Sequence, residues 1–290
     1  MSEELDRRIH AFRDDLASET LKGKITAGKF VRGERRRVKS AVVDMRPAPD
    51  KSIGIDTQLI YGDIVRVFDV AEGWAWCQSL RDNYVGYVDD SQLAKRDITA
   101  PPSTHLVCVP RTCSYPEADM KAPRSNTLSL GTALAIIGEA ETRGTRYLEC
   151  ADGQFYVARH LLPIDQPVDD YVSIAETLIH TPYLWGGSSA FGIDCSGLVQ
   201  LSLLLAGKKV QRDSDMQAAG IGTELGFATM NGGLQRGDLV FWKGHVGIMR
   251  DEQELIHANG HTMNVAIETL EDAIERIGYL YGFPTTLRRP

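Results

Sequence analysis

The stretch from Tyr183 to Leu205 reads YLWGGSSAFGIDCSGLVQLSLLL, and its character changes halfway along. The first half contains three glycines and shows neither a helical nor an alternating pattern, which predicts an irregular loop. The second half is apolar at helical spacing as far as Leu205, and Gly207 follows as a typical stop signal. We therefore expect a glycine-rich loop that runs directly into a helix.

The junction between this loop and helix carries the residues of chemical interest. Asp194 stands at the junction and is a natural N-cap, which places Cys195 in the first helical turn. The positive end of the helix dipole favours a thiolate there, so we expect a lowered pKa for the Cys195 thiol and a nucleophilic sulfur. The alternative is a small buried cysteine with no chemical role, which is common for free cysteines.

Composition describes an ordinary globular chain. The protein has 290 residues, of which 43% are hydrophobic, and a formal net charge of −7. This length suggests two or three domains, and the acidic balance argues against nucleic acid or an anionic membrane as the main partner. No apolar run reaches the length of a membrane span, the N-terminus lacks the pattern of a secretory signal, and the cysteine count of five is odd. These features predict a cytoplasmic location.

The N-terminal residues 1–34 are charged and amphipathic. Apolar residues recur at helical spacing on one face, at Leu5, Ile9, Phe12 and Leu16. We therefore expect one or two short helices here, forming a clasp that packs on the rest of the chain.

Two β-rich blocks follow, at residues 35–98 and 104–165, with the linker Thr99–Ser103 between them. Both blocks consist of short apolar runs between turn signals, which is typical of small barrels. They also repeat at an offset of about 69 residues, which indicates a duplication. The matching positions include Leu59 with Leu128, Gly62 with Gly131, and Leu93 with Leu162.

The last region, residues 170–290, predicts helices followed by an antiparallel sheet. A helical run that starts near Tyr171 ends before Pro182, and the loop and helix described above come next. Three short apolar runs then alternate with turn signals, at Leu239–Trp242, His245–Met249 and Leu255–Asn259. This order of elements predicts an α+β domain.

Two histidines stand on neighbouring expected strands of that sheet. His245 opens one strand and His257 lies within the next, so an antiparallel hairpin brings them together. A helix that faces the sheet would add Cys195 to this pair. Nucleophilic catalysis needs a base beside the nucleophile and a third group that orients the base. His245 is the candidate base and His257 the candidate orienting group, although isolated strand histidines are usually structural.

The motif order now resembles a known family. TPYLWGG, DCSGLVQ, RDS, GDLVFW, HVGI and LIHAN occur in the order found in NlpC-type papain-like cell-wall peptidases. The resemblance covers Tyr171 to Phe283. The two upstream blocks resemble bacterial SH3-type barrels, and the whole chain resembles the γ-D-glutamyl-L-diamino-acid endopeptidases of murein recycling. The resemblance implies a papain-like catalytic domain behind two SH3-like barrels, and no metal or cofactor. The implied substrate is a free murein peptide with an unblocked L-Ala, cut between γ-D-Glu and the diamino acid through an acyl-enzyme.

The resemblance also implies roles for individual residues. In the catalytic group, Cys195 matches the nucleophile, His245 the base, His257 the third polar residue and Tyr183 a tyrosine that stabilises the oxyanion. The implied substrate-binding positions in the last domain are Asp194, Ser196, Ser214, Arg212 and Trp185, the last of which has a packing role as its alternative.

The first SH3-type block is implied to read the free amine of L-Ala. Tyr84 and Asp56 are the matching tyrosine and carboxylate. Because the family presents a longer acidic side chain here, Glu72 is the reserve candidate for the carboxylate. Diaminopimelate and lysine stay open as the third substrate residue. Two other functions stay open as well, namely an amidase or acyltransferase on the same scaffold and a catalytically idle peptide-binding module.

Overall fold

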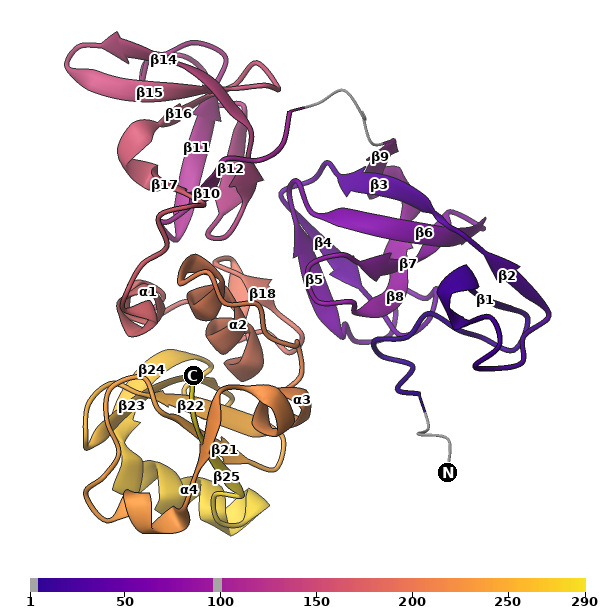
Figure 1. Ribbon diagram of the computed structural model, residues 1–290. Helices are drawn as coiled ribbons and strands as arrows, with labels where there is room; N and C mark the ends of the chain where they lie inside the picture. The colour runs from indigo at the N-terminus through magenta and orange to yellow at the C-terminus, as the bar shows by residue number, and fades with distance from the viewer. Residues whose placement is uncertain (1–4, 96–100) are drawn as a thin grey trace.

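The computed structural model describes residues 5–95 and 101–290, and it contains three bodies (Figure 1). A first β unit spans residues 34–95, a second β unit spans 105–163, and an α+β unit spans 171–290. The first four residues of the expected clasp, and residues 99 and 100 of the expected linker, lie outside the described part. Within the described residues, no helix is both long and apolar enough to cross a membrane.

The N-terminal segment does not form the helices expected for residues 1–34. Its described part contains only short extended pieces and a single 3-10 turn, at β1 (Leu16–Ser18), η1 (Glu19–Leu21) and β2 (Lys29–Val31). β1 pairs in parallel with β2, and Ala11 and Leu16 are buried against Phe68 and Trp76 of the first β unit. The helical prediction is wrong because this packing buries Leu16 and Ala11 in an extended chain, and tertiary contacts outweigh a weak local preference.

The first β unit encloses a small apolar core between two sheets. Its five-stranded sheet has the order β8-β7-β6-β3-β9, and β4 pairs with β5 in a second sheet. The elements are β3 (Glu34–Val38), β4 (Val42–Met45), β5 (Thr57–Ile60), β6 (Ile64–Ala71), β7 (Trp74–Ser79), β8 (Val85–Asp89), η2 (Asp90–Gln92) and β9 (Leu93–Lys95).

The second β unit has a similar order of elements, again in two sheets. The strand orders are β12-β11-β16-β15-β14 and β13-β10-β17. The elements are β10 (His105–Val107), β11 (Arg111–Tyr115), β12 (Asn126–Ser129), β13 (Ala133–Leu134), β14 (Ile136–Thr142), β15 (Thr145–Cys150), β16 (Phe155–Val157), η3 (Ala158–His160) and β17 (Leu161–Pro163).

The offset between the two β units is not constant. Gly62 and Gly131 follow β5 and β12 with φ angles of 86° and 83°, as the offset of 69 requires. Later in the units, Leu93 pairs with Val38 while Leu161 pairs with Val107, so the counterpart of Leu93 is Leu161. The expected match of Leu93 with Leu162 is therefore wrong by one residue, because the intervening loops differ in length.

The α+β unit is built on a six-stranded antiparallel sheet with the order β20-β25-β21-β22-β23-β24. Its elements are α1 (Tyr171–Thr177), β18 (Ser188–Ser189), β19 (Gly192–Ile193), α2 (Cys195–Leu205), α3 (Ser214–Gly220), β20 (Thr223–Leu225), η4 (Phe227–Met230), β21 (Leu239–Trp242), β22 (His245–Met249), β23 (Glu254–Asn259), β24 (Asn264–Thr269), α4 (Leu270–Tyr281) and β25 (Thr286–Arg289).

The two faces of this sheet are covered by different helices. Leu239 and Phe241 of β21 point into the apolar cluster that contains α2, while Val240 and Trp242 point into the cluster that contains α4. This alternation follows from the period of two along a strand. The α+β prediction is confirmed, and α2 is held against β22 and β23 as the proposed chemistry requires.

Both β units contact the loop and helix that carry Cys195. Leu130 of the second β unit belongs to the same buried cluster as Leu201 of α2, and the ribbon shows that unit above α1 and α2 (Figure 1). In the first β unit, the side-chain oxygen of Gln58 accepts hydrogen bonds from the backbone of Ser188 and the hydroxyl of Ser189, each at 3.2 Å. These contacts fix the position of the first β unit beside the loop.

Candidate active site

The start of α2 is stabilised by Asp194, as the N-cap prediction requires. One carboxylate oxygen accepts a hydrogen bond from the backbone N–H of Gly197 at 2.7 Å. The other accepts from the backbone N–H of Gly186 at 3.0 Å, which folds the glycine-rich loop back onto the helix start. A side chain at Gly197 would overlap the carbonyl oxygen of Gly187, so this close approach of loop and helix requires glycine. Gly207 follows α2 with a φ of 73°, which matches its predicted role as a stop signal.

Arg212 lies beneath the site rather than in it. Its side chain is 1% exposed, and its guanidinium pairs with both oxygens of Asp194 at 3.0 and 2.7 Å. It also donates to the hydroxyls of Ser196 and Thr57, each at 2.8 Å. The prediction that Arg212 binds the substrate is therefore not supported, because these partners already occupy its donors. Arg212 instead fixes the N-cap residue.

Cys195 lies at a cavity of about 330 Å³ that opens between the α+β unit and the first β unit. The residue is only 7% exposed, and burial, followed by the nearby charge of Asp194, raises the pKa of its thiol to about 12. A backbone hydrogen bond from Val246 acts in the opposite direction. The expectation of a lowered thiol pKa is therefore wrong for the unliganded site, since burial outweighs the helix dipole. The resting sulfur is a neutral thiol.

The two histidines meet as predicted. Nε2 of His245 lies 2.8 Å from Nδ1 of His257. Val246, which hydrogen-bonds to the Cys195 thiol, follows His245 directly, so the sulfur lies beside the first residues of β22. Burial lowers the pKa of His245 to about 3, and the neighbouring His257 and Arg276 act in the same direction. At neutral pH, His245 is therefore a neutral imidazole that is able to accept a proton.

The glycine-rich loop contributes two aromatic residues to the cavity. Tyr183 lines the cavity, and burial raises the pKa of its hydroxyl, with further increases from Cys195 and Asp194. Trp185 also lines the cavity and is 70% exposed. Such exposure does not fit the packing alternative for Trp185, and it leaves the indole free to contact a ligand.

The first β unit forms the opposite wall of the cavity. Asp56 and Tyr84 both line it, and the Tyr84 hydroxyl donates to Asp213 at 3.1 Å. Burial raises the pKa of Asp56, and the nearby Asp213 raises it further. The reserve candidate Glu72 is exposed in the turn between β6 and β7 and does not line the cavity. Of the two candidates for the carboxylate, Asp56 lines the cavity and Glu72 does not.

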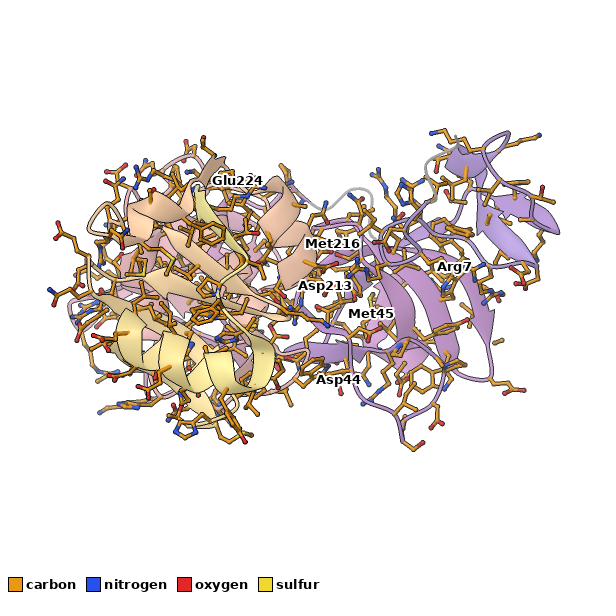
Figure 2. All side chains as sticks on the ribbon, turned by 90° about the horizontal axis from the view of Figure 1, so that it is seen from below. Arg7, Asp44, Met45, Asp213, Met216 and Glu224 are labelled. Atoms are coloured by element: carbon orange, nitrogen blue, oxygen red, sulfur yellow. The ribbon has the colours of Figure 1, made fainter. Side chains whose placement is uncertain are left out.

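Three charged residues in the cavity were not among the sequence candidates. Arg8, from the N-terminal segment, donates to Asp213 at 2.9 Å and to Asp215 at 2.8 Å. Asp213 could have been found, because it stands between Arg212 and Ser214 in a motif that was already singled out. No sequence signal marked Arg8. Figure 2 shows Asp213 at the boundary between the α+β unit and the first β unit.

The cavity thus brings together most of the sequence candidates from distant parts of the chain. The candidates that line it are Asp56, Tyr84, Tyr183, Trp185, Asp194, Cys195, Ser196 and Ser214. His245, His257 and Arg212 lie behind this surface. The arrangement places a thiol, a proton acceptor and an acidic wall around one opening, which suits attack on a carbonyl compound that carries a positive charge.

Comparison with known proteins agrees with this geometry. Residues 45–93 match the bacterial dipeptidyl-peptidase SH3 domain, and residues 180–276 match the NlpC/P60 family. A γ-D-glutamyl-L-lysine dipeptidyl-peptidase of Bacillus cereus is 27% identical over 231 residues, which cover 70% of this chain and 67% of the relative. The protein of the same name from Bacillus subtilis is 28% identical over 243 residues, covering 76% of this chain and 77% of the relative.

A solved structure shares the fold over nearly the whole chain. The crystal structure of an NlpC/P60 family protein from Bacillus cereus superposes with a TM-score of 0.73 at 21% identity. The match covers 88% of this chain and 99% of that one. Sequence and fold thus agree on both regions, and the chain contains an NlpC/P60 domain, matched over residues 180–276, that is preceded by a bacterial SH3 domain, matched over residues 45–93.

Proposed function

We propose that the protein is a cysteine endopeptidase that cuts free murein peptides with an unblocked N-terminal L-Ala. The bond hydrolysed joins γ-D-Glu to a diamino acid. One observation carries the proposal: Asp56 and Tyr84 of the first β unit line the same cavity as Cys195, so that a peptide amine and a scissile carbonyl fit one opening. The family and the similarity to dipeptidyl-peptidases support a peptidase, and hence a hydrolase acting on peptide substrates.

The reaction starts from the neutral pair of Cys195 and His245. As Sγ attacks the carbonyl carbon, the thiol proton passes to His245, so a free thiolate need not accumulate. The tetrahedral oxyanion is stabilised by the Tyr183 hydroxyl and by the backbone N–H of Cys195 at the start of α2. His245 then protonates the leaving amine and a thioester forms. A water molecule that gives its proton to His245 hydrolyses the thioester, and the thiol is restored.

The substrate amine is held by the wall opposite the sulfur. Among the described residues, none donates a hydrogen bond to the Asp56 carboxylate, and Asp213 adds a second negative charge beside it. An ammonium group between them relieves this repulsion and supplies the missing donor. An acylated amine has no such charge and leaves the half-buried Asp56 carboxylate without a donor from the ligand, whereas Asp213 keeps its contacts with Arg8 and Tyr84.

The proposal is tested with L-Ala-γ-D-Glu-diaminopimelate as substrate. Replacing the nucleophile by Cys195→Ala is expected to lower kcat by more than about 1,000-fold, since loss of the nucleophile removes the covalent route. The matched control is Cys113→Ala, at a partly buried cysteine of β11 in the second β unit that does not line the cavity, which should keep wild-type activity. The products L-Ala-D-Glu and diaminopimelate are identified by mass spectrometry. Full turnover by Cys195→Ala would contradict the assignment of the nucleophile.

A catalytically idle peptide-binding module is the second candidate, and one observation favours it. The pKa of about 12 for the buried Cys195 thiol describes a sulfur of low intrinsic reactivity. The two functions are separated by incubating wild-type protein with the free peptide. Binding in calorimetry without any product would identify a binding module, whereas product formation that depends on Cys195 identifies a peptidase.

A further inference from the structure

An acidic side chain stands behind the histidine pair. Glu268, on β24, places Oε1 2.8 Å from Nε2 of His257, whose side chain is completely buried. No other partner for this nitrogen occurs among the described residues, and the contact is close rather than well aligned. The same carboxylate pairs with Arg276 from α4. None of these residues lines the cavity, so Glu268 does not contact a ligand there and acts on the reaction through His257 and through its charge.

We propose, building on the peptidase function above, that Glu268 is a positioning residue that sets which nitrogen carries the proton on both imidazoles. A carboxylate accepts hydrogen bonds and cannot donate them. It therefore holds the proton of His257 on Nε2 and leaves Nδ1 of His257 as an acceptor. His245 must then donate from its own Nε2, because that atom lies 2.8 Å from Nδ1 of His257. Nδ1 of His245 is left with the free lone pair.

This proton arrangement is the productive one. In a neutral imidazole only one ring nitrogen accepts a proton, and the hydrogen bond made by the other nitrogen selects it. With Nε2 of His245 committed to His257, the thiol proton of Cys195 goes to Nδ1. Without an acceptor at its Nε2, His257 is free to carry its proton on Nδ1 and to donate it to Nε2 of His245. The proton of His245 then lies on Nδ1, so this nitrogen can no longer accept the thiol proton and the base is lost.

Glu268 also contributes charge. Burial alone would raise the pKa of Glu268, but the contacts from His257 and Arg276 lower it to about 2, so it is a carboxylate throughout the neutral range. Its negative charge favours protonated His245, whereas the charges of Arg276 and of a protonated His257 oppose it. The relay consists of Glu268, His257, His245 and Cys195. The other charged groups that face it are Arg276 on α4 and, beside the sulfur, Asp194 and Arg212.

The relay is tested without any substrate, through alkylation of Cys195 by iodoacetamide as a function of pH. Mass spectrometry of the peptide that contains Cys195 separates it from the other cysteines. Glu268→Gln keeps the shape but removes the charge and replaces one acceptor oxygen by an N–H₂ donor, so the group behind Nε2 of His257 is no longer an acceptor only. It should raise the apparent thiol pKa and slow alkylation at pH 7 by about tenfold, the equivalent of one pKa unit. Glu275→Gln removes a charge from an exposed position of α4 and should match wild type.

Arg276→Gln distinguishes the relay from a purely structural ion pair. It leaves the Glu268 carboxylate without its neutralising cation, so the relay predicts faster alkylation and a lower apparent thiol pKa. If the pair of Glu268 and Arg276 is purely structural, both variants should slow the alkylation of Cys195 to the same extent. Equal profiles for Glu268→Gln and wild type, or a slower rate for Arg276→Gln, would overturn the inference. Because the assay uses no peptide, failure to cut murein peptides would refute only the proposed function.

Discussion

At the residue scale, Arg212 illustrates how a charged side chain can be essential to a site that it does not enter. It is buried with Asp194, the residue that caps α2 and ties the glycine-rich loop to the helix. Removing one member of a buried ion pair leaves the other charge without compensation. The capping carboxylate would then be isolated directly beside Cys195.

We therefore expect Arg212→Met to lower the free energy of unfolding by about 3–5 kcal/mol, as is usual when a buried pair is broken. Urea denaturation of the full chain measures this change. Arg146→Ala is the control, because its pair with Glu139 is more than 60% exposed on both sides and such surface pairs contribute little to stability. Similar losses for the two variants would show that the Arg212 network does not stabilise the fold.

Residues whose role follows from their position in the chain could be predicted from the sequence. Their pKa values and their exposure could not, because these properties depend on burial. Cys195 and Asp194 could be placed by the change from loop to helix, and the histidines by their strands. The pKa of Cys195 and the burial of Arg212 depend on what packs around them, and that information lies in Thr57, β22 and other distant parts of the chain. Arg212, a charged residue in the RDS motif, was thus mistaken for a ligand-binding one.

At the element scale, the start of α2 depends on a glycine inside a helix. Gly→Ala substitutions in helices usually stabilise by about 0.5–1 kcal/mol. At Gly197 an added Cβ would overlap the carbonyl oxygen of Gly187, and backbone atoms cannot move away cheaply. Gly→Ala should therefore stabilise this protein at some helix positions and destabilise it at others.

Gly197→Ala is expected to lower the melting temperature and to displace the Asp194 cap, while Gly278→Ala in α4 raises the melting temperature because nothing lies within 4 Å of its added Cβ. Calorimetric melting of the two single variants measures both effects. Stabilisation by Gly197→Ala would mean that the loop does not pack on α2 as described.

Elements with strong local signals were predictable, and those with weak signals were not. The glycine-rich loop, the capped helix and the strands after residue 238 combine periodicity with turn or cap residues, and each forms as expected. The N-terminal segment offered only an apolar spacing. Its packing partners, Phe68 and Trp76, lie more than 50 positions after Leu16, and burial against them stabilises the extended conformation of the segment.

At the scale of the whole molecule, the candidate site exists only because the bodies are docked. The cavity wall combines Arg8 from the N-terminal segment, Tyr84 from the first β unit and Asp213 from the α+β unit, and Asp213 accepts hydrogen bonds from both of the others. The family resemblance implied that the first β unit takes part in the site by reading the substrate amine. The participation of Arg8 was beyond sequence reasoning, because a single arginine carries no periodic or motif signal.

The central claim is that this composite cavity presents Cys195 to peptides whose free amine is held by Asp56. It is tested most directly by comparing kcat/KM of the wild-type protein for L-Ala-γ-D-Glu-diaminopimelate and for the same peptide acetylated on L-Ala. We predict at least about a 100-fold preference for the free amine, because a site built around a polar group rejects analogues that lack it. Asp56→Asn should reduce that preference. Equal hydrolysis of the two peptides by the wild-type protein would contradict the account.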